Sequence, residues 1–286
     1  MRVFQARAYD TAGSDSVNIR ECADCTFAWQ FPIGRSVEQS IQYFDVAYAG
    51  GGRSRSTYFS ADRKAGIASL EFEFVSSLPV RERTLLDIGA GAGFFAGLAA
   101  EHGWLVTAVD PALEIDRVAA FQRVTAIRGT TEQVPKGAVF DVVTLWDVIE
   151  HATDPLEMLQ DAQRFLRPGG WLVLETGNYK SAARVMAGRA HWMFQLDHRW
   201  YFSPESLELL LSESGFSKFV HCDRVLRPGW RGTCEYRGPL FRQLCGSAIR
   251  KPWQVLSHIA KHRELTNAKR WKSAGIEIFA LAASIA

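Results

Sequence analysis

The feature that most constrains the fold is a regular alternation of strand and helix patterns between residues 61 and 177. Apolar residues recur at helical spacing over residues 61–77 and 94–102. Five short apolar runs are expected to be strands: 84–88, 105–109, 124–128, 139–145 and 171–175. Strands that alternate with helices imply a parallel sheet, and right-handed crossovers make it doubly wound. Because ligands of such sheets bind beyond the carboxyl ends of the strands, the residues after each strand are the first site candidates.

A glycine-rich segment, DIGAGAG at residues 87–93, follows the first of these strands. Glycine lets the backbone adopt unusual dihedral angles and lets a ligand approach closely. Asp110 ends the second strand, and a carboxylate there can accept hydrogen bonds from both hydroxyls of a ribose. Glycine pairs alone are equally typical of a tight turn, but the loop and Asp110 together predict a cofactor that contains adenosine.

The spacing of the glycines distinguishes between adenosine cofactors. The dinucleotide fingerprint G-x-G-x-x-G places a pyrophosphate at a helix N-terminus, whereas this loop has the spacing G-x-G-x-G. Asp87, two residues before Gly89, would repel a pyrophosphate. The same carboxylate would attract the ammonium of a methionine moiety, directly or through water. The loop therefore favours a cofactor with a cationic amino-acid part over a nicotinamide dinucleotide.

Four motifs, in this order, resemble those of class I S-adenosylmethionine-dependent methyltransferases. LLDIGAGAGFF resembles the first motif of that family, FDVV at 140–143 its fourth-strand motif and LRPGG at 166–170 the turn before its fifth strand. The segment HRWYFSPESLELLLSESGF at 198–216 resembles a later part of many small-molecule methyltransferases. The likeness covers roughly residues 61–225.

The resemblance implies an α/β, Rossmann-like, doubly wound sheet of seven strands. The last strand, expected at 275–284, would be antiparallel. We expect residues 1–60 to be an irregular N-terminal segment and lid, and residues 61–286 to be the methyltransferase domain. Within that domain, residues 178–272 would contribute the substrate cleft and a basic insertion before the last strand.

The resemblance also implies S-adenosylmethionine as the cofactor and assigns its contacts. The loop would line the methionine and ribose, Asp110 would hold the ribose hydroxyls, and the residues after the third strand would border the adenine. The family often has Gly-Asp where this chain has Gly129-Thr130, which leaves the adenine contact to a backbone group or a hydroxyl. Trp146 and Asp147 would lie near the sulfonium. The expected cofactor-binding residues are Asp87, Gly89, Ala90, Gly91, Gly93, Phe94, Asp110, Pro111, Thr130, Thr131, Glu132, Trp146 and Asp147.

Two histidines are candidates for a general base. Methyl transfer depends on positioning, and a hydroxyl or carbon acid also needs a base. Glu150 and His151 follow the fourth strand and resemble the Glu-His pair of quinone O-methyltransferases, in which case His151 could deprotonate a hydroxyl. Glu150 could orient His151, contact the substrate or help hold a metal, but one carboxylate does not predict a metal site. His198 lies in an aromatic stretch that suits either a substrate wall or ordinary packing, and His151 could simply buttress the next helix.

We therefore expect a methyltransferase that acts on a small molecule, at a hydroxyl oxygen. Three alternatives stay open. One is carbon or nitrogen methylation of an acidic or lipid-linked substrate. The second is a non-catalytic protein that binds the cofactor as a scaffold, and the third is an NAD(P) oxidoreductase.

The N-terminal region holds two further candidates. Cys22 and Cys25 resemble half of a zinc ribbon, but a structural zinc needs four ligands and neither cysteine nor histidine precedes Cys22. We therefore expect no metal. Tyr43, Tyr48 and Tyr58 lie in the expected lid, where each could bind the methionine carboxylate or the substrate.

The segment 226–272 holds eleven lysines and arginines against two acids, together with three tryptophans. It could be a solvated insertion, or it could attract an acidic substrate, such as a phosphorylated one, or an anionic membrane surface. An amphipathic helix at 253–260 would allow a lipid-linked substrate and peripheral membrane contact. The net charge of the chain is only +2 and no recognition module is evident, so no nucleic-acid partner is expected.

The N-terminal residues lack the apolar core of a signal peptide, and no run of roughly 18 apolar residues occurs. Five cysteines, an odd number, then indicate a reduced, cytoplasmic protein. The sequence does not set the oligomeric state.

Overall fold

The computed structural model divides the chain into two compact units. The structure describes residues 1–8, 15–24, 27–49, 61–112, 115–118, 121–181, 184, 187–222 and 278–285. The first unit includes residues 1–34 and 177–207, and the second includes residues 35–176, 208–222 and the chain from 280 onward. The domain boundaries expected from the sequence stay predictions.

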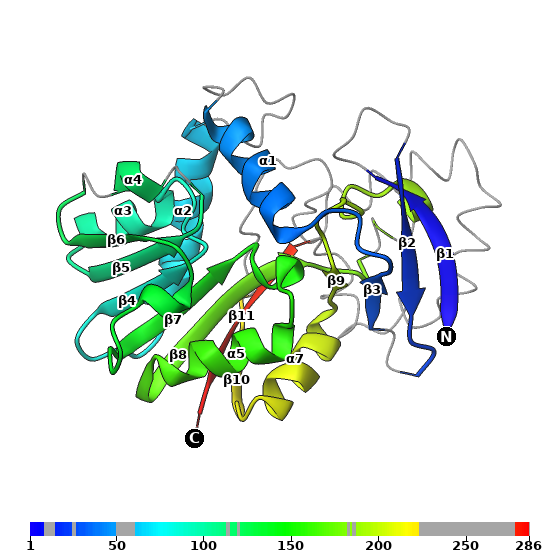
Figure 1. The fold of residues 1–286 in the computed structure, drawn as a ribbon. Coiled ribbons are helices and arrows are strands. Elements are labelled where there is room, and N and C mark those ends of the chain that lie inside the picture. Colours follow the sequence, from blue (N-terminus) through cyan, green and yellow to red (C-terminus); the bar gives the residue numbers. More distant parts are fainter. Residues whose placement is uncertain are drawn as a thin grey trace, which may run out of the picture. The chain divides into compact units, whose positions relative to one another are not determined.

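The second unit is built on a seven-stranded sheet with the order β10-β11-β8-β7-β4-β5-β6 (Figure 1). Neighbouring strands from β8 to β6 pair in parallel, whereas β11 pairs antiparallel to β10. The strands are β4 (Thr84–Ile88), β5 (Leu105–Asp110), β6 (Val124–Arg128), β7 (Phe140–Trp146), β8 (Leu166–Gly177), β10 (Lys218–His221) and β11 (Ile278–Ser284). The predicted sheet with an antiparallel last strand is confirmed.

The chain order reverses between β4 and β7. From β4 the chain moves outward through β5 and β6, and it returns to the other side of β4 with β7 and β8. Ligands of open parallel sheets bind at this switch point, beyond the carboxyl ends of the two central strands. The geometry of the sheet therefore places the candidate site at the ends of β4 and β7.

The interior strands β7 and β11 of this sheet are largely apolar and buried. β11 is buried at every residue and β7 at all but its last, as expected for strands without a solvent-facing side. The helices of the unit include α2, which packs on α3, and α5, which begins at a proline after the cap residue Asp154. The helical elements are α1 (Val37–Ala49), α2 (Ala61–Ser76), α3 (Phe94–Glu101), α4 (Ile115–Val118), η2 (Thr131–Gln133), η3 (Ile149–His151), α5 (Pro155–Arg164) and α7 (Pro204–Glu213).

The turn expected before the fifth strand lies inside β8. Phe140 of β7 pairs with Leu166 of β8, and the next pair in the register is Val142 with Trp171. Two residues of β7 thus correspond to five residues of β8. Residues 167–170 therefore bulge out of the ladder, and Gly169 has a positive φ of 76°. The observed strand begins earlier than predicted because it includes this bulge.

The first unit contains a four-stranded antiparallel sheet, although residues 1–60 were expected to be irregular. Its order is β1-β2-β3-β9, with β1 (Arg2–Arg7), β2 (Ser16–Glu21), β3 (Ala28–Gln30) and β9 (Trp200–Tyr201). The expectation was wrong because the strands are short and because strands such as β2 have one polar face. In β2 only Val17 and Ile19 are buried.

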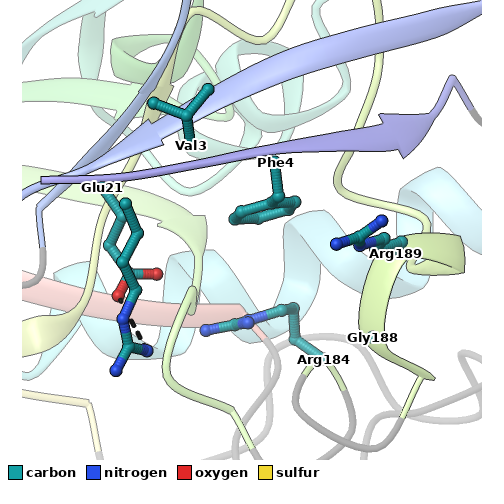
Figure 2. Close-up of a pocket in the computed structure, with 7 residues that line it drawn as sticks. Val3, Phe4, Glu21, Arg184, Gly188 and Arg189 are labelled. Carbon is teal, nitrogen blue, oxygen red and sulfur yellow. Dashed lines mark ion pairs between the residues drawn. The ribbon is translucent and has the colours of Figure 1, made fainter.

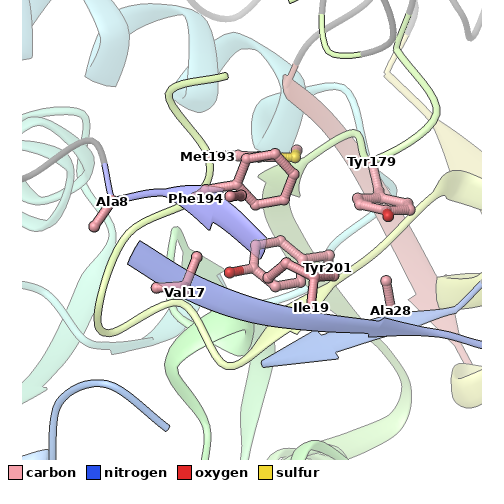
Figure 3. Close-up of a cluster of buried hydrophobic side chains, with 9 residues drawn as sticks. Ala8, Val17, Ile19, Ala28, Tyr179, Met193, Phe194 and Tyr201 are labelled. Atoms are coloured by element: carbon pink, nitrogen blue, oxygen red, sulfur yellow. The ribbon is translucent and has the colours of Figure 1, made fainter. Parts of the chain in front are cut away.

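One face of this sheet carries the core of the first unit. Figure 3 shows Phe194 and Tyr201 in one cluster with Val17 and Ile19 of β2 and Ala28 of β3. The two rings meet edge to face with centroids 5.4 Å apart. The short helix η4 (Gly188–Ala190) packs against β1, where Arg189 lies beside Phe4 (Figure 2). Phe194 and Tyr201, from the aromatic stretch, are therefore core residues.

The other face of the sheet carries further aromatic residues. Trp29 and Trp200 are direct cross-strand partners, and the ring of Phe27 stacks on Trp200 with centroids 5.7 Å apart. All three are half-buried. Because these rings are partly exposed, they could still contribute to the predicted apolar substrate wall, which stays a prediction.

Several expectations concern residues outside the described ranges. They are the lid residue Tyr58, the cysteines Cys25, Cys234 and Cys245, and the basic segment 226–272. Tyr48 lies in α1, and Tyr43 in the same helix packs under the guanidinium of Arg35, 4.3 Å from its ring centroid. Among the described helices, none has the length and apolarity to cross a membrane.

Candidate active site

The glycine loop joins the carboxyl end of β4 to the start of α3. Gly89, Gly91 and Gly93 have φ angles of 75°, 52° and 72°, which side-chain-bearing residues rarely adopt. A β-carbon on Gly89 would clash with Val148, and one on Gly93 would clash with Val118. The loop therefore needs glycine both for its dihedral angles and for its close packing.

Asp110 holds the loop in place from the end of the neighbouring strand β5. One carboxylate oxygen accepts a hydrogen bond from the Gly91 N–H at 2.8 Å, and the other accepts from the Ala112 N–H at 2.7 Å. Burial raises the pKa of Asp110, and these two hydrogen bonds act against that rise. Each oxygen keeps a second lone pair, which is what two ribose hydroxyls require.

Asp87 is a buried carboxylate near the end of β4. It accepts a hydrogen bond from the Thr144 hydroxyl of β7 at 2.8 Å. Burial raises the pKa of Asp87 to about 7, the Thr144 hydroxyl lowers it, and the charge of Asp110 raises it further. A cation beside this pair of carboxylates would be stabilised, whereas a pyrophosphate would be repelled.

The remaining loop residues take backbone or surface positions. The Ala90 N–H donates to the Val109 carbonyl at 3.3 Å, and Phe94 begins α3. Pro111 is exposed directly after Asp110. The Lys64 ammonium lies 5.9 Å from the Phe94 ring centroid. The structure therefore places the predicted residues 87–94, 110 and 111 together at the carboxyl ends of the adjacent strands β4 and β5.

The segment after β6 is held by a capping box that the sequence interpretation missed. The Thr130 N–H donates to the Gln133 side-chain oxygen at 2.7 Å, and the Thr130 hydroxyl caps η2. Thr131 is half-buried, while Thr130 and Glu132 are exposed. The Thr-x-x-Gln spacing was the signal available for this cap. The adenine contacts predicted for Thr130, Thr131 and Glu132 stay predictions.

Trp146 and Asp147 follow the end of β7. The Trp146 ring meets Phe95 edge to face at 5.1 Å, and its indole Nε1 is buried without a hydrogen-bond partner among the described residues. Asp147 has a φ of 53° and donates its N–H to the Glu175 carbonyl at 3.2 Å. The left-handed residue turns the chain sharply from the strand into η3.

Glu150 and His151 lie in η3, directly beyond this turn. Glu150 is buried and accepts a hydrogen bond from the Thr176 hydroxyl of β8 at 2.9 Å. Burial raises the pKa of Glu150 to about 7, the charge of Asp147 raises it further, and His151 lowers it. His151 is half-buried. The sequence interpretation missed Thr176, because nothing in a strand threonine reveals its partner.

His198, the other candidate base, belongs to the first unit. It is buried, and in the chain it lies between Phe194 and the strand β9. Its role stays a prediction. The three candidate catalytic residues thus divide between the units, with Glu150 and His151 in the second.

The donor groups of the second unit fit S-adenosylmethionine. Asp110 offers two acceptor oxygens, Asp87 offers a buried negative charge for a cationic methionine part, and the glycine loop lets a ligand approach its backbone. Residues 59–219 match a family described as Methyltransferase domain. The chain belongs to the S-adenosylmethionine-dependent methyltransferases.

Curated relatives agree with this assignment. The chain is 34% identical over 170 residues to the ubiquinone biosynthesis O-methyltransferase of Roseobacter denitrificans, covering 54% of this chain and 68% of the relative. It is 32% identical over 120 residues to that of Paracidovorax citrulli, covering 38% of this chain and 50% of the relative. The chain thus spans about half the length of the latter relative.

Solved structures show the same fold. A methyltransferase of Thermotoga maritima, described as a possible histamine N-methyltransferase, has a TM-score of 0.53 at 18% identity, covering 85% of this chain and 99% of its own. A 1,6-didemethyltoxoflavin N1-methyltransferase of Burkholderia thailandensis has a TM-score of 0.53 at 16% identity, covering 92% and 97%. With the family established, S-adenosylmethionine, and not a nicotinamide dinucleotide, is the cofactor of this methyltransferase.

Proposed function

We propose that this methyltransferase transfers the methyl group of S-adenosylmethionine to a hydroxyl oxygen of a small molecule. The observation that carries the proposal is the Glu150-His151 pair in η3, directly beyond the strand end at the switch point. Relatives 31–34% identical to the chain are named ubiquinone biosynthesis O-methyltransferases, which supports oxygen as the acceptor atom.

The cofactor supplies a methyl group already activated by its sulfonium, so the protein must position the acceptor and remove one proton. In the proposed step the acceptor oxygen forms a bond to the methyl carbon. The carbon–sulfur bond breaks and its electron pair stays on sulfur, giving S-adenosylhomocysteine. The hydroxyl proton passes to the His151 imidazole, whose unprotonated ring nitrogen can accept it.

Glu150 acts as a positioning residue in this proposal. The Thr176 hydroxyl of β8 holds the Glu150 carboxylate in place through a hydrogen bond. Glu150 is buried, so its carboxylate is kept out of bulk water. An ionised Glu150 next to His151 favours the imidazolium that forms when the proton is taken up. The predicted contacts of Asp87, Asp110 and the glycine loop hold the cofactor in the same unit. His198 is the second candidate base.

We also propose that the acceptor is acidic or lipid-linked and that the protein acts in the cytoplasm. The positive charge that would attract such an acceptor would also favour peripheral contact with an anionic membrane. The support is compositional: the eleven basic residues of segment 226–272 for the acceptor and the membrane contact, and the five cysteines, an odd number, for the cytoplasm. Carbon or nitrogen methylation and a non-catalytic scaffold are the competing functions.

The test uses methyl-labelled cofactor with phenolic and other hydroxyl-bearing acceptor pools, and identifies the methylated atom by NMR. We expect an oxygen-linked methyl group. His151→Ala should lower kcat by about 100-fold with unchanged affinity for S-adenosylhomocysteine, as expected for loss of a general base. His221→Ala, which removes an exposed histidine on β10, is the control and should keep the activity.

The outcomes separate the hypotheses. A steep loss in His198→Ala with near-normal rates in His151→Ala would transfer the base to His198. Labelled products methylated only on nitrogen or carbon would overturn the oxygen assignment. Tight binding of S-adenosylhomocysteine without any labelled product would favour the scaffold.

A further inference from the structure

A pocket in the first unit is lined by three arginines. It has a volume of about 530 Å³ and lies between β1, β2 and the segment that carries Arg184 and η4 (Figure 2). The volume falls in the range of small-molecule sites. Its lining consists of Arg2, Val3, Phe4, Glu21, Arg184, Gly188 and Arg189.

The positive charges of the pocket exceed its single negative charge. Among the described residues that line the pocket, Glu21 is the only acid, and it is already engaged by Arg2 at 3.8 Å and by the Tyr179 hydroxyl at 2.8 Å. In the described part of the chain, neither Arg184 nor Arg189 forms an ion pair with a carboxylate. Two guanidinium groups therefore line the pocket without a direct ion pair to a described carboxylate.

Arg184 is held in a fixed position. Its Nε donates a hydrogen bond to the Tyr179 carbonyl, and its guanidinium stacks on the Tyr179 ring, 3.9 Å from the centroid. Burial lowers the pKa of Arg184, while Tyr179 and Glu21 act against that shift. A guanidinium fixed on a buried tyrosine is pre-organised, so little side-chain entropy is lost when it binds an anion.

The pocket also has an apolar wall. Figure 2 shows Phe4 extending from β1 above Arg184, with Arg189 to one side. The Arg189 guanidinium lies 5.9 Å from the Phe4 ring centroid. A ligand that fits this wall carries an apolar or aromatic part next to its anionic group.

We propose that this pocket binds a phosphate monoester with an apolar substituent. Three arginines and one glutamate leave a net charge of +2, which matches a phosphate dianion and exceeds a carboxylate. Guanidinium forks bind phosphate oxygens in pairs. The inference rests on the residues of the first unit, and a binding measurement tests it without reference to methyl transfer.

The test is isothermal titration calorimetry of the full chain with phenyl phosphate, with phenylacetate as the carboxylate of similar size. We expect saturable one-to-one binding of phenyl phosphate, and affinity at least about tenfold weaker for phenylacetate, because each charge-assisted hydrogen bond contributes over a factor of ten. Binding should strengthen between pH 5 and 7, as the ester gains its second charge near pH 6. Equal affinity for the two probes, or no binding of phenyl phosphate, would overturn the proposal.

Variants tie the binding to the pocket. Arg189→Ala removes an exposed side chain and should weaken phenyl phosphate binding at least about tenfold. Arg7→Ala removes the same charge from an exposed position on the same strand, outside the pocket lining, and should change the affinity less than about twofold. Equal losses in both variants would mean a general charge effect and would reject the site. Arg184→Lys, which keeps the charge but not the fork, should weaken binding by a similar factor.

The phosphate ester could be a free metabolite or a lipid headgroup. Sedimentation with vesicles distinguishes the two sources: vesicles of phosphatidylcholine with phosphatidic acid are compared with phosphatidylcholine alone. Phenyl phosphate binding together with Arg189-dependent sedimentation assigns the site to a lipid headgroup. Phenyl phosphate binding without such sedimentation assigns it to a soluble ester.

Discussion

Thr144 on β7 donates a 2.8 Å hydrogen bond to Asp87 on β4, so the two strands at the switch point share one buried carboxylate. Burial raises the pKa of Asp87 to about 7, and the Thr144 hydroxyl opposes that rise. In the cofactor-free protein this carboxyl therefore holds its proton up to about neutral pH. A cationic ligand favours the ionised form, which couples ligand binding to release of that proton.

The first prediction concerns the affinity for S-adenosylhomocysteine, which keeps the ammonium of the cofactor. If only ionised Asp87 supports tight binding, the affinity should rise by about tenfold from pH 6 to pH 8, as one group of pKa about 7 ionises. Titration calorimetry in buffers of different ionisation enthalpy should show the released proton. Asp87→Asn should bind more weakly and with a flat profile, and an unchanged slope in that variant would contradict the assignment.

The second prediction concerns stability without ligand. A carboxyl whose folded pKa is raised from 3.8 to about 7 contributes stability below about pH 4, and that contribution is lost as the pH rises through 7. Asp87→Asn should therefore be more stable than the wild type at pH 8, by at most about 4 kcal/mol, and nearly equal at pH 4. Urea unfolding at the two pH values measures the difference. A variant less stable at pH 8 than the wild type would contradict this sign.

The parts of the site that the sequence predicted are local in the chain. The strand β4, the glycine loop and the start of α3 are contiguous, and the periodicity and glycines of residues 84–101 reveal them. Asp110 follows from its place at the end of the next strand, and its bond to Gly91 confirms that the two features belong together in space. The strands of the sheet lie close to their predicted positions for the same reason.

The parts that the sequence did not reveal depend on distant pairing. Trp29 pairs with Trp200, so β3 and β9 complete the sheet of the first unit although the two residues are 171 positions apart in the chain. Thr144 and Thr176 are ordinary strand residues until the fold places a carboxylate opposite each hydroxyl. Short strands with one polar face, such as β2, also give a weak periodic signal.

The third prediction concerns Asp141, whose pKa is shifted in the opposite direction to that of Asp87. Burial alone would raise its pKa, but hydrogen bonds from the Thr84 and Glu82 N–H groups and the charge of Arg167 lower it overall. Such a group contributes stability above its unfolded pKa, and this is lost as the pH falls through the folded value. Asp141→Asn should therefore destabilise at pH 7, by about 1–3 kcal/mol, and less at pH 3. Urea unfolding of the variant at both pH values measures this, and an equal loss at both would point to packing instead of charge.

The last prediction separates the two reasons why the loop needs glycine, its positive φ angles and its close packing. Gly89 has a positive φ, and a β-carbon there would meet Val148, whereas Gly103 has a φ of 87° with open space around it. Gly103→Ala should cost about 1–2 kcal/mol from backbone strain alone. Gly89→Ala should cost more than that and should also weaken S-adenosylhomocysteine binding, because the loop must move away from Val148.

The double variant Gly89→Ala, Val148→Ala decides whether that movement is the cause. Removing the γ-carbons of Val148 relieves the clash but leaves the backbone strain, so it should restore part of the affinity lost in Gly89→Ala. Val148→Ala alone measures the cost of the smaller side chain and completes the cycle. Additive losses in stability and affinity would show that Gly89 and Val148 act independently. The close packing at Gly89 would then have no part in shaping the cofactor loop.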